Sequence, residues 1–338
     1  MANNKAIKIV VIVGPTASGK SDLALRLVSW LRSGRIAKQF VINGSEIISA
    51  DSRQVYRGMN IGTGKVSKKE QKIAKHHLID VANPKKQFTA DDFKKLGQKA
   101  IQEIMAKNKI PIIVGGTGFY VDALLDRTLI AQVPPNQKLR IKLEKQSLEK
   151  LYSRLLALDP RRAETIDREN KRRLIRALEI ILTTGKPVPI LNNESEITNY
   201  EVLWIGLKSV GLEKRIKRRL DTRLRQGMIK EVVNLHKKGV SWKRLDDFGL
   251  EYRQIAIYLK HSKQTQSAKS QTQNFKKSWY YEKLLREIIK YSKRQMTWFK
   301  RNKNIHWVNP LVGGKKEAIK LASDFLHNGD MARNSSGS

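Results

Sequence analysis

The sequence contains no cysteine, which excludes disulfide bonds, thiol catalysis and thiolate zinc sites. It also lacks a long apolar run near its start, since Ile9–Val13 is far too short to cross a membrane. The amino terminus does not show the pattern of a signal peptide, and no lipidation signal is found. We therefore expect a cytoplasmic protein that does not associate with a membrane.

Acidic residues are scarce relative to basic ones. The chain has 31 Asp and Glu against 67 Lys and Arg, a formal net charge of +36, and the excess is spread along the whole sequence. A role in solubility would account for some of it, but a polyanionic partner such as RNA accounts for it better. The 338 residues, 40% of them hydrophobic, are enough for one large core with an insertion or for two domains.

Three short apolar runs indicate the strands of a buried parallel sheet. They are Ile7–Val13, Glu46–Ala50 and Pro111–Val114. Helical spacing follows the first run over Ser21–Leu31, and a helix near 90–107 precedes the third. This alternation predicts an α/β fold with a doubly wound parallel sheet.

The sequence changes character after about Asp126. Residues 135–183 are expected to be almost wholly helical, and Glu201–Leu207 resembles a strand again. We therefore predict a helical insertion domain within a single α/β core. The expected parts are 1–126, the first part of the core; 127–198, the insertion; 199–327, the second part of the core with basic C-terminal helices; and 328–338, a disordered tail.

The second part of the core is expected to be largely helical. A basic helical region is predicted over 212–238 and a long helix over 277–299, followed by a strand at 305–308 and a last helix at 315–326. Between the first two, residues 262–274 (SKQTQSAKSQTQN) are polar and low in complexity. Such a composition favours a mobile loop.

Residues 14–21 read GPTASGKS and match the P-loop pattern G-x-x-x-x-G-K-[ST] between a strand and a helix. Its members are Gly14, Pro15, Thr16, Ala17, Ser18, Gly19, Lys20 and Ser21. The glycines let backbone N–H groups face phosphate oxygens, Lys20 supplies a positive charge, and Ser21 can ligate Mg²⁺. The third strand ends in Gly115 and Gly116, not in a Mg²⁺-binding Asp, so a motor or GTPase is disfavoured. A small-molecule kinase or a group transferase fits better.

Two further strand ends carry candidate functional residues. Asp51 follows the second strand and should face the P-loop, because the carboxyl ends of parallel strands converge on the ligand crevice. Its carboxylate could take a proton from a nucleophile, or it could cap a helix. Thr117, in the turn GGTGFY, could offer a hydroxyl to a ligand or could belong to an ordinary turn. His76 and His77 point to different faces, so we expect a structural role for the pair and not a metal site.

Basic residues and aromatic rings are interleaved near the carboxyl terminus, over residues 276–303. Cations bind a phosphate backbone, and rings stack on exposed bases. An ordinary amphipathic helix with buried rings would explain part of this pattern. The insertion adds Arg172, Arg173 and Arg176, of which the first and last share a helix face. Two basic segments that flank a phosphate site indicate a large polyanion.

At this point the sequence resembles a known family, the bacterial tRNA dimethylallyltransferases (tRNA isopentenyltransferases). Matching stretches occur in the family's order over about residues 8–310. They are GPTASGKS, ISADSRQVYRGMNIGTGK, HHLID, PIIVGGTGFY, RRLIRALEIILTTGKP, GLEYRQ and KRQMTWFKRNKNIHWV. The resemblance implies a P-loop α/β core with a helical insertion. It also implies transfer of a dimethylallyl group from its diphosphate to N6 of adenine 37, beside the tRNA anticodon, with release of pyrophosphate.

The resemblance also implies roles for individual residues. Asp51 would be the general base, the P-loop would hold the diphosphate with Mg²⁺ on Ser21, and Lys20 and Arg223 would stabilise the leaving pyrophosphate. Thr117 would help to position the adenine, which must leave its stack. The expected tRNA contacts are Asp51, Ser52, Arg53, Gln54, Arg140, Arg172, Arg173, Arg176, Gly249, Tyr252, Arg253, Lys293, Arg294, Gln295 and Trp298. We expect a monomer of bacterial origin.

The sequence departs from the family pattern at a few places. Asn60 stands where Asp is common, Gly64 where Ala is common, and Lys300 where Arg is usual. None of these changes removes a proposed catalytic group. The alternatives are a small-molecule kinase that uses ATP, an enzyme that prenylates free adenine nucleotides, and a non-catalytic RNA-binding protein. The first two leave the basic segments without a role, and the third leaves the intact P-loop, Asp51 and Arg223 unexplained.

Overall fold

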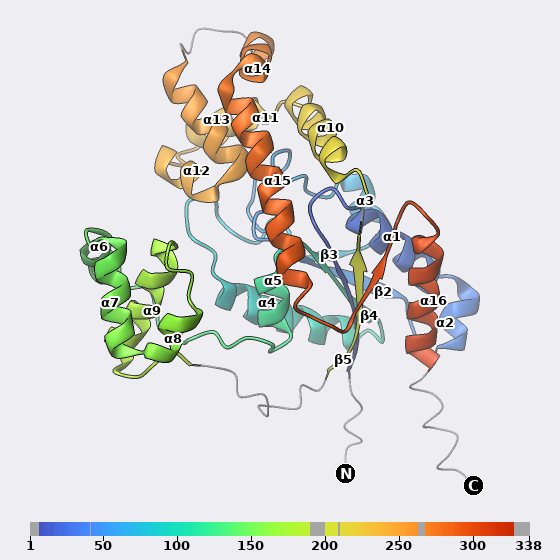
Figure 1. Cartoon of the computed structure of the whole chain (residues 1–338). Coiled ribbons are helices and arrows are strands. Elements are labelled where there is room, and N and C mark those ends of the chain that lie inside the picture. Colours follow the sequence, from blue (N-terminus) through green and yellow to red (C-terminus); the bar gives the residue numbers. More distant parts are fainter. Residues whose placement is uncertain (1–6, 41, 190–199, 209, 263–267, 328–338) are drawn as a thin grey trace. The chain divides into compact units, whose positions relative to one another are not determined.

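The computed structural model describes residues 7–40, 42–189, 200–208, 210–262 and 268–327 (Figure 1). The chain divides into two compact units, one formed by Met1–Leu125 with Asn199–Ser338 and the other by Asp126–Thr198. The tail expected at 328–338 lies outside the described residues. The larger unit contains the sheet, and the smaller one is helical in its described part.

The described part of the larger unit forms a six-stranded sheet in which each neighbouring pair is parallel. The spatial order is β3-β2-β4-β1-β5-β6. The strands are β1 (Ile7–Val13), β2 (Ser45–Ala50), β3 (His76–His77), β4 (Ile110–Gly115), β5 (Tyr200–Leu207) and β6 (Ile305–Val308). The predicted α/β core with a parallel sheet is confirmed. Because all strands run the same way, Val13, Ala50, Gly115 and Leu207 end at one edge of the sheet.

Helices cover both faces of this sheet. On one face, Val10 and Ile12 pack with α1 (Lys20–Leu31) and α16 (Gly314–His327). On the other, Ile9 and Val11 pack with α4 (Ala90–Met105) and α5 (Gly118–Leu124). The alternation follows from the two-residue period of a strand, and it explains why β1 is apolar at almost every position. The short helices α2 (Gly34–Gln39) and α3 (Lys68–Ile73) complete this part of the unit.

A second hydrophobic core lies beyond the carboxyl edge of the sheet and is built mainly from helices. They are α10 (Leu212–Arg225), α11 (Met228–Lys237), α12 (Trp242–Phe248), α13 (Leu250–His261), α14 (Ala268–Lys277) and α15 (Trp279–Phe299). Val55 and Met59, from the segment after β2, are fully buried in the same core. The segment that carries Asp51 is therefore anchored on these helices.

The loop predicted over 262–274 is wrong for its second half. Residues 263–267 lie outside the described part, but Ala268–Lys277 forms helix α14. Phe275 explains the difference, because it is fully buried and its ring meets Tyr258 edge-on at 5.1 Å between centroids. A polar segment becomes helical here because one aromatic anchor packs against α13 and α15.

The smaller unit consists of α6 (Gln137–Glu144), α7 (Leu148–Leu158), α8 (Pro160–Thr165) and α9 (Lys171–Thr184) in its described part. Each helix begins at a side-chain cap, since Asn136, Ser147, Asp159 and Asn170 all accept a backbone N–H. Its own core includes Leu143, Leu151, Leu155, Leu174 and Leu178. In the described part of the whole chain, no helix is both long and apolar enough to span a membrane.

Candidate active site

The P-loop follows β1 at the carboxyl edge of the sheet. Gly14 and Gly19 have φ values of 148° and 98°, which a residue with a side chain rarely adopts. A Cβ on Gly14 would lie 3.0 Å from the Leu207 carbonyl oxygen, so glycine also lets the loop approach the end of β5. Lys20 Nζ donates to the carbonyl oxygens of Gly14 (2.9 Å) and Pro15 (2.7 Å). The Lys20 ammonium group therefore lies over the P-loop, at the place where a phosphate would bind.

The ammonium group of Lys20 is partly buried and lies near another cation, Arg219. Burial, and after it the charge of Arg219, lower the pKa of Lys20 to about 7, while the carboxylate of Asp51 acts in the opposite direction. A bound diphosphate would favour the protonated form. We therefore expect binding of pyrophosphate to take up a proton at Lys20, and affinity to fall as the pH rises above about 7.

This uptake can be measured by calorimetric titration with pyrophosphate at pH 8 in buffers of different ionisation enthalpy. The matched control is Lys20→Arg, whose guanidinium stays charged and should take up fewer protons than the wild type. Equal proton uptake by the two proteins would contradict a low pKa for Lys20.

Asp51 begins a turn directly after β2 and is half-buried. Its Oδ1 accepts hydrogen bonds from the backbone N–H groups of Arg53 (2.8 Å) and Gln54 (3.3 Å). Within the described residues, its Oδ2 accepts none. Asp51 can therefore act both as a cap and as a proton acceptor, because Oδ1 caps the turn and Oδ2 is left to accept a proton.

Thr117 lies next to Asp51 because two strand ends approach very closely. A Cβ on Gly115 would be 2.0 Å from the Ala50 carbonyl oxygen, and the Thr117 N–H donates to that oxygen at 3.2 Å. The Thr117 hydroxyl accepts from the Ser52 N–H (3.1 Å), and the Tyr291 hydroxyl lies near it. Burial, and next the nearby charge of Asp51, raise the pKa of Tyr291 to about 12. Tyr291 is therefore a neutral hydroxyl beside Asp51, a neighbour that the sequence did not reveal.

Helix α15 joins the P-loop to the turn that contains Thr117. Gln295 Oε1 accepts from the Thr16 N–H (2.9 Å), and Gln295 Nε2 donates to the Gly116 carbonyl (2.8 Å). A Cβ on Gly116 would lie 2.3 Å from Gln295 Nε2, which explains the glycine. One turn further, Trp298 Nε1 donates to Asp122 Oδ2 at 2.8 Å, and Gly118 leaves room for its ring. Gln295 is buried, so the structure gives it an internal role where we expected a tRNA contact.

Two arginines of α10 lie beside the P-loop, one helical turn apart. Arg219 and Arg223 line a small cleft together with Thr16 and Ala17. Arg223 Nη1 donates to the Gly62 carbonyl and to Glu251 Oε1, both at 3.0 Å. In the described part of the chain, the Arg219 guanidinium makes no hydrogen bond. Burial, and next the charge of Arg223, lower the pKa of Arg219 to about 10.

The sequence indicates Arg223 as a candidate for this role but does not reveal Arg219. The segment KRIKRRLDTRLR is so rich in cations that helical spacing alone does not single one out. Only the packing of α10 shows that residues 219 and 223 share the face toward the P-loop.

Other residues expected to contact tRNA differ in exposure. Lys293 and Arg294 are exposed on α15, and Arg53 and Arg253 are partly exposed on the helical side of the site. Gly249, with φ of 72°, joins α12 to α13. Tyr252 is 2% exposed, and its hydroxyl donates to Glu231 at 2.8 Å, so its position is internal.

The smaller unit holds its arginines differently. Arg140 makes a two-pronged contact with Glu179, with both N–O distances at 2.8 Å, and Arg176 Nη1 donates to the same carboxylate at 2.6 Å. Glu179 is fully buried, so two guanidinium groups are fixed by one carboxylate. Arg172 and Arg173 are exposed on the same helix, α9. The unit therefore presents Arg172 and Arg173 to solvent, while Arg140 and Arg176 are held by Glu179.

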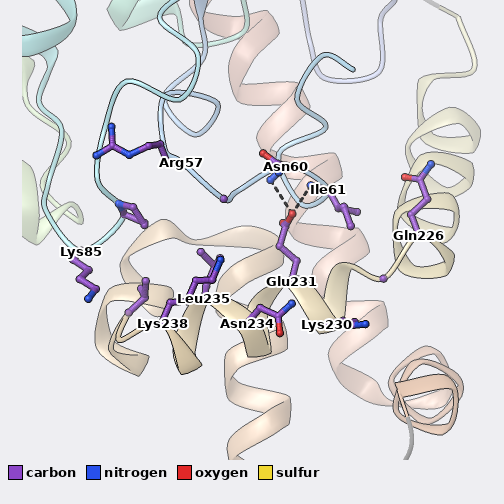
Figure 2. Close-up of a pocket in the computed structure, with 14 residues that line it drawn as sticks. Arg57, Asn60, Ile61, Lys85, Gln226, Lys230, Glu231, Asn234, Leu235 and Lys238 are labelled. Carbon is purple, nitrogen blue, oxygen red and sulfur yellow. Dashed lines mark hydrogen bonds between the residues drawn. The ribbon is translucent and has the colours of Figure 1, made fainter. Parts of the chain in front are cut away.

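A basic pocket of about 480 Å³ is lined in part by residues within 57–61, in the segment that follows Asp51 (Figure 2). Arg57, Lys85, Lys230 and Lys238 line it, together with one buried carboxylate, Glu231. Glu231 accepts hydrogen bonds from three successive backbone N–H groups, those of Asn60 (2.8 Å), Ile61 (2.7 Å) and Gly62 (3.0 Å). The carboxylate thus fastens the Asp51 segment to α11.

We expect Glu231→Ala to lower the free energy of unfolding by about 3 kcal/mol, because several polar groups lose a partner at once. Urea unfolding would measure this change. Glu213→Ala on the exposed side of α10 is the control and should change stability by less than about 0.5 kcal/mol. A Glu231→Ala protein as stable as the wild type would show that the carboxylate does not hold the segment.

The two histidines have structural contacts. His77 Nε2 is 2.7 Å from Glu46 Oε2, and His76 Nδ1 is 2.8 Å from the Ala74 carbonyl oxygen. Glu46 also contacts Lys109 at 2.8 Å, and these contacts hold its pKa down at about 2 although burial acts in the opposite direction. Both histidines lie in β3, at the edge of the sheet.

The site therefore combines a P-loop, a carboxylate at the next strand end and two arginines on a third element. A family model described as IPP transferase matches residues 54–302. The chain belongs to the IPP transferase family. Among curated relatives, the tRNA dimethylallyltransferase 1 of Syntrophus aciditrophicus is 40% identical over 322 residues, which are 92% of this chain and 96% of that protein.

Solved structures show the same relationship for this IPP transferase family member. The tRNA isopentenylpyrophosphate transferase of Bacillus halodurans superposes with a TM-score of 0.63 and 31% identity, over 97% of this chain and 99% of that one. A eukaryotic dimethylallyltransferase acting on tRNA gives a TM-score of 0.73 at 24% identity, over 96% of this chain and 80% of that one. The latter likeness shows the shared fold.

Proposed function

We propose that this enzyme transfers a dimethylallyl group from dimethylallyl diphosphate to N6 of adenine 37 in the anticodon loop of tRNA and releases pyrophosphate. The observation that carries the proposal is the Asp51 Oδ2, which accepts no hydrogen bond from the described residues and lies at the carboxyl ends of the strands, where the P-loop begins. A P-loop protein that only hydrolysed a nucleotide would not need a carboxylate free to accept a proton beside the hydroxyls of Thr117 and Tyr291. Membership of the IPP transferase family supports the same reaction.

Asp51 is proposed as the general base. As the adenine N6 attacks the allylic carbon, a nitrogen–carbon bond forms and the carbon–oxygen bond to the diphosphate breaks. The proton of N6 passes to Asp51 Oδ2, and the bonding electrons leave with pyrophosphate. The Oδ1 contacts with Arg53 and Gln54 orient the carboxylate for this transfer.

The P-loop and α10 would stabilise the leaving pyrophosphate. Its negative charge grows as the carbon–oxygen bond breaks, and fixed cations in a partly dry site stabilise growing charge most effectively. Lys20 and Arg219 are proposed to make these contacts. Arg223 lines the same cleft, but its guanidinium is already bound to Gly62 and Glu251.

The hydroxyls of Thr117 and Tyr291 are proposed to position the adenine beside Asp51. Thr117 lies after the end of β4, and Tyr291 lies on α15. The Ser52 N–H already fixes the Thr117 hydroxyl. The base must leave its stack to reach them, as in other enzymes that act on a base.

Ser21 fits a Mg²⁺ site of the P-loop kind. It is exposed in the first turn of α1, directly after Lys20. Mg²⁺ commonly takes one or two protein oxygens together with phosphate oxygens and water, so a single hydroxyl is sufficient. When bound, the ion would neutralise charge on the diphosphate.

Exposed cations are proposed to bind the tRNA backbone. On the larger unit they are Arg53, Arg253, Lys293 and Arg294, and on the smaller unit Arg172 and Arg173. Phosphate contacts of this kind supply affinity that weakens with salt. A monomer acting in the cytoplasm is the proposed working state.

The deciding experiment incubates the enzyme with unmodified tRNA, dimethylallyl diphosphate and Mg²⁺. Digestion and mass measurement of the nucleosides should reveal N6-dimethylallyl adenosine. Parallel reactions replace tRNA with AMP, or the prenyl donor with ATP. Prenylated AMP without prenylated tRNA, or consumption of ATP on a small acceptor, would overturn the proposal.

A further inference from the structure

A buried ion pair lies beside the P-loop. Arg223 Nη1 of α10 and Glu251 Oε1 of α13 are 3.0 Å apart, and their side chains are only 10% and 12% exposed. The same Arg223 nitrogen donates to the Gly62 carbonyl, also at 3.0 Å. The pair therefore joins two helices to the segment that runs from Asp51.

Gly64 provides the space that this arrangement needs. A Cβ on Gly64 would lie 2.0 Å from Arg223 Nη2 and 2.4 Å from Arg219 Nη2, and φ at this residue is +58°. The backbone therefore packs directly on both guanidinium groups. Arg223 is held from three sides, by Gly62, Gly64 and Glu251, whereas Arg219 is held only by packing.

Charged groups beside the P-loop affect one another. Lys20, Arg219 and Arg223 are positive, and Asp51 and Glu251 are negative; Arg219 and Asp51 act on Lys20, and Arg223, Glu251 and Asp51 act on Arg219. Burial raises the pKa of Glu251, and the charges of Arg223 and then Arg219 favour its ionised form. An ionised Glu251 cancels the charge of the arginine it contacts.

We propose that Glu251 is a positioning residue that holds Arg223 back from the diphosphate and so limits how tightly the site binds donor and pyrophosphate. This inference rests on the proposed function and adds a determinant of product release to it. The cations that meet the diphosphate are then Lys20 and Arg219, and Arg223 lines the same cleft as one half of a neutral pair. An enzyme that releases pyrophosphate on every cycle benefits from such a limit, because excess positive charge would retain the product.

The test uses inorganic pyrophosphate with Mg²⁺ and no tRNA, with dissociation constants measured by calorimetry. Glu251→Gln keeps the volume of the side chain but removes its charge, so we expect pyrophosphate to bind roughly tenfold more tightly, as one added unit charge near the site gives. Arg223→Gln leaves Glu251 unpaired, so binding should weaken by a similar factor. Damage to the fold would weaken binding in both variants, whereas the proposal predicts opposite signs.

The double variant Arg223→Gln with Glu251→Gln decides between two roles for Arg223. A neutral pair should restore the wild-type constant to within about threefold. If Arg223 bound pyrophosphate directly, the double variant would bind as weakly as Arg223→Gln, and the proposal would be overturned. This comparison remains available even if Glu251→Gln does not fold.

Asp221→Asn is the matched control. It removes one negative charge from α10 and frees Lys276, which lies 3.0 Å from Asp221. Residue 221 is two positions from both 219 and 223 and faces away from them on the helix. The Asp221→Asn protein should bind pyrophosphate as tightly as the wild type. A gain in affinity equal to that of Glu251→Gln would reveal a general effect of net charge. Because no tRNA is present, these constants are independent of whether prenylated tRNA is formed.

Discussion

Replacing Asp51 by Asn should lower kcat for prenyl transfer to tRNA by a factor of about 10²–10⁴, the usual loss when a general base is removed. Asn keeps a side-chain oxygen that can still accept from the Arg53 and Gln54 N–H groups, so the turn should persist. What is lost is the charge, and with it the group that takes the N6 proton. Single-turnover formation of N6-dimethylallyl adenosine is the measurement.

A second variant distinguishes the role of the Asp51 carboxylate as a general base from its role as a cap of the turn. Asp51→Ala removes both oxygens, so it should lose the same activity and also some stability, about 1 kcal/mol as for other caps. Both variants should bind tRNA with an affinity within a few-fold of the wild type. An Asp51→Asn enzyme with normal kcat would exclude this carboxylate as the base.

Replacing Arg219 by Gln should reduce kcat by about 10²–10³-fold, the range found when one fixed group that stabilises developing charge is removed. The guanidinium lies beside Thr16 and Ala17 and has no hydrogen-bond partner in the described part of the chain. Its charge is therefore available as pyrophosphate leaves. The effect should be larger on kcat than on KM for tRNA, because the arginine acts on the donor.

The neighbouring Arg218 offers a control for this prediction. It is exposed on another face of α10, so Arg218→Gln loses the same charge at nearly the same place in the sequence. It should alter kcat by less than threefold, and any change should appear in the salt dependence of tRNA binding. Equal losses in the two variants would mean that the cation acts at long range on tRNA and not on the leaving group.

Local patterns in the sequence were sufficient to predict the part of the site that lies at strand ends. The β-branched run Ile7–Val13 followed by GPTASGKS predicts both the strand and the P-loop, because each depends only on neighbouring residues. The position of Asp51 followed from the rule that parallel strands end at one edge. The P-loop core was predicted in the same way.

The parts that sequence analysis missed depend on contacts between distant residues. Gln295 meets Thr16 across 279 positions, and Glu231 meets Asn60 across 171, so no local pattern announces either contact. Helix α14 was predicted as a loop because its composition is polar, and only the burial of Phe275 explains it. For Arg219, the abundance of cations in α10 hid a second arginine on the face toward the P-loop.

The pairing of β1 has a consequence for how the protein is made on the ribosome. β1 contains the first described residues, yet one of its two neighbours is β5, from Ile7 beside Tyr200 to Val13 beside Gly206. The helices described within Asp126–Thr198 are synthesised before that neighbour emerges, and they have a core of their own. Gln295, which ties the P-loop to Gly116, appears later still. The nascent chain must therefore keep an apolar strand with one edge unpaired until most of the protein has been translated, a period in which protection by a chaperone would reduce aggregation.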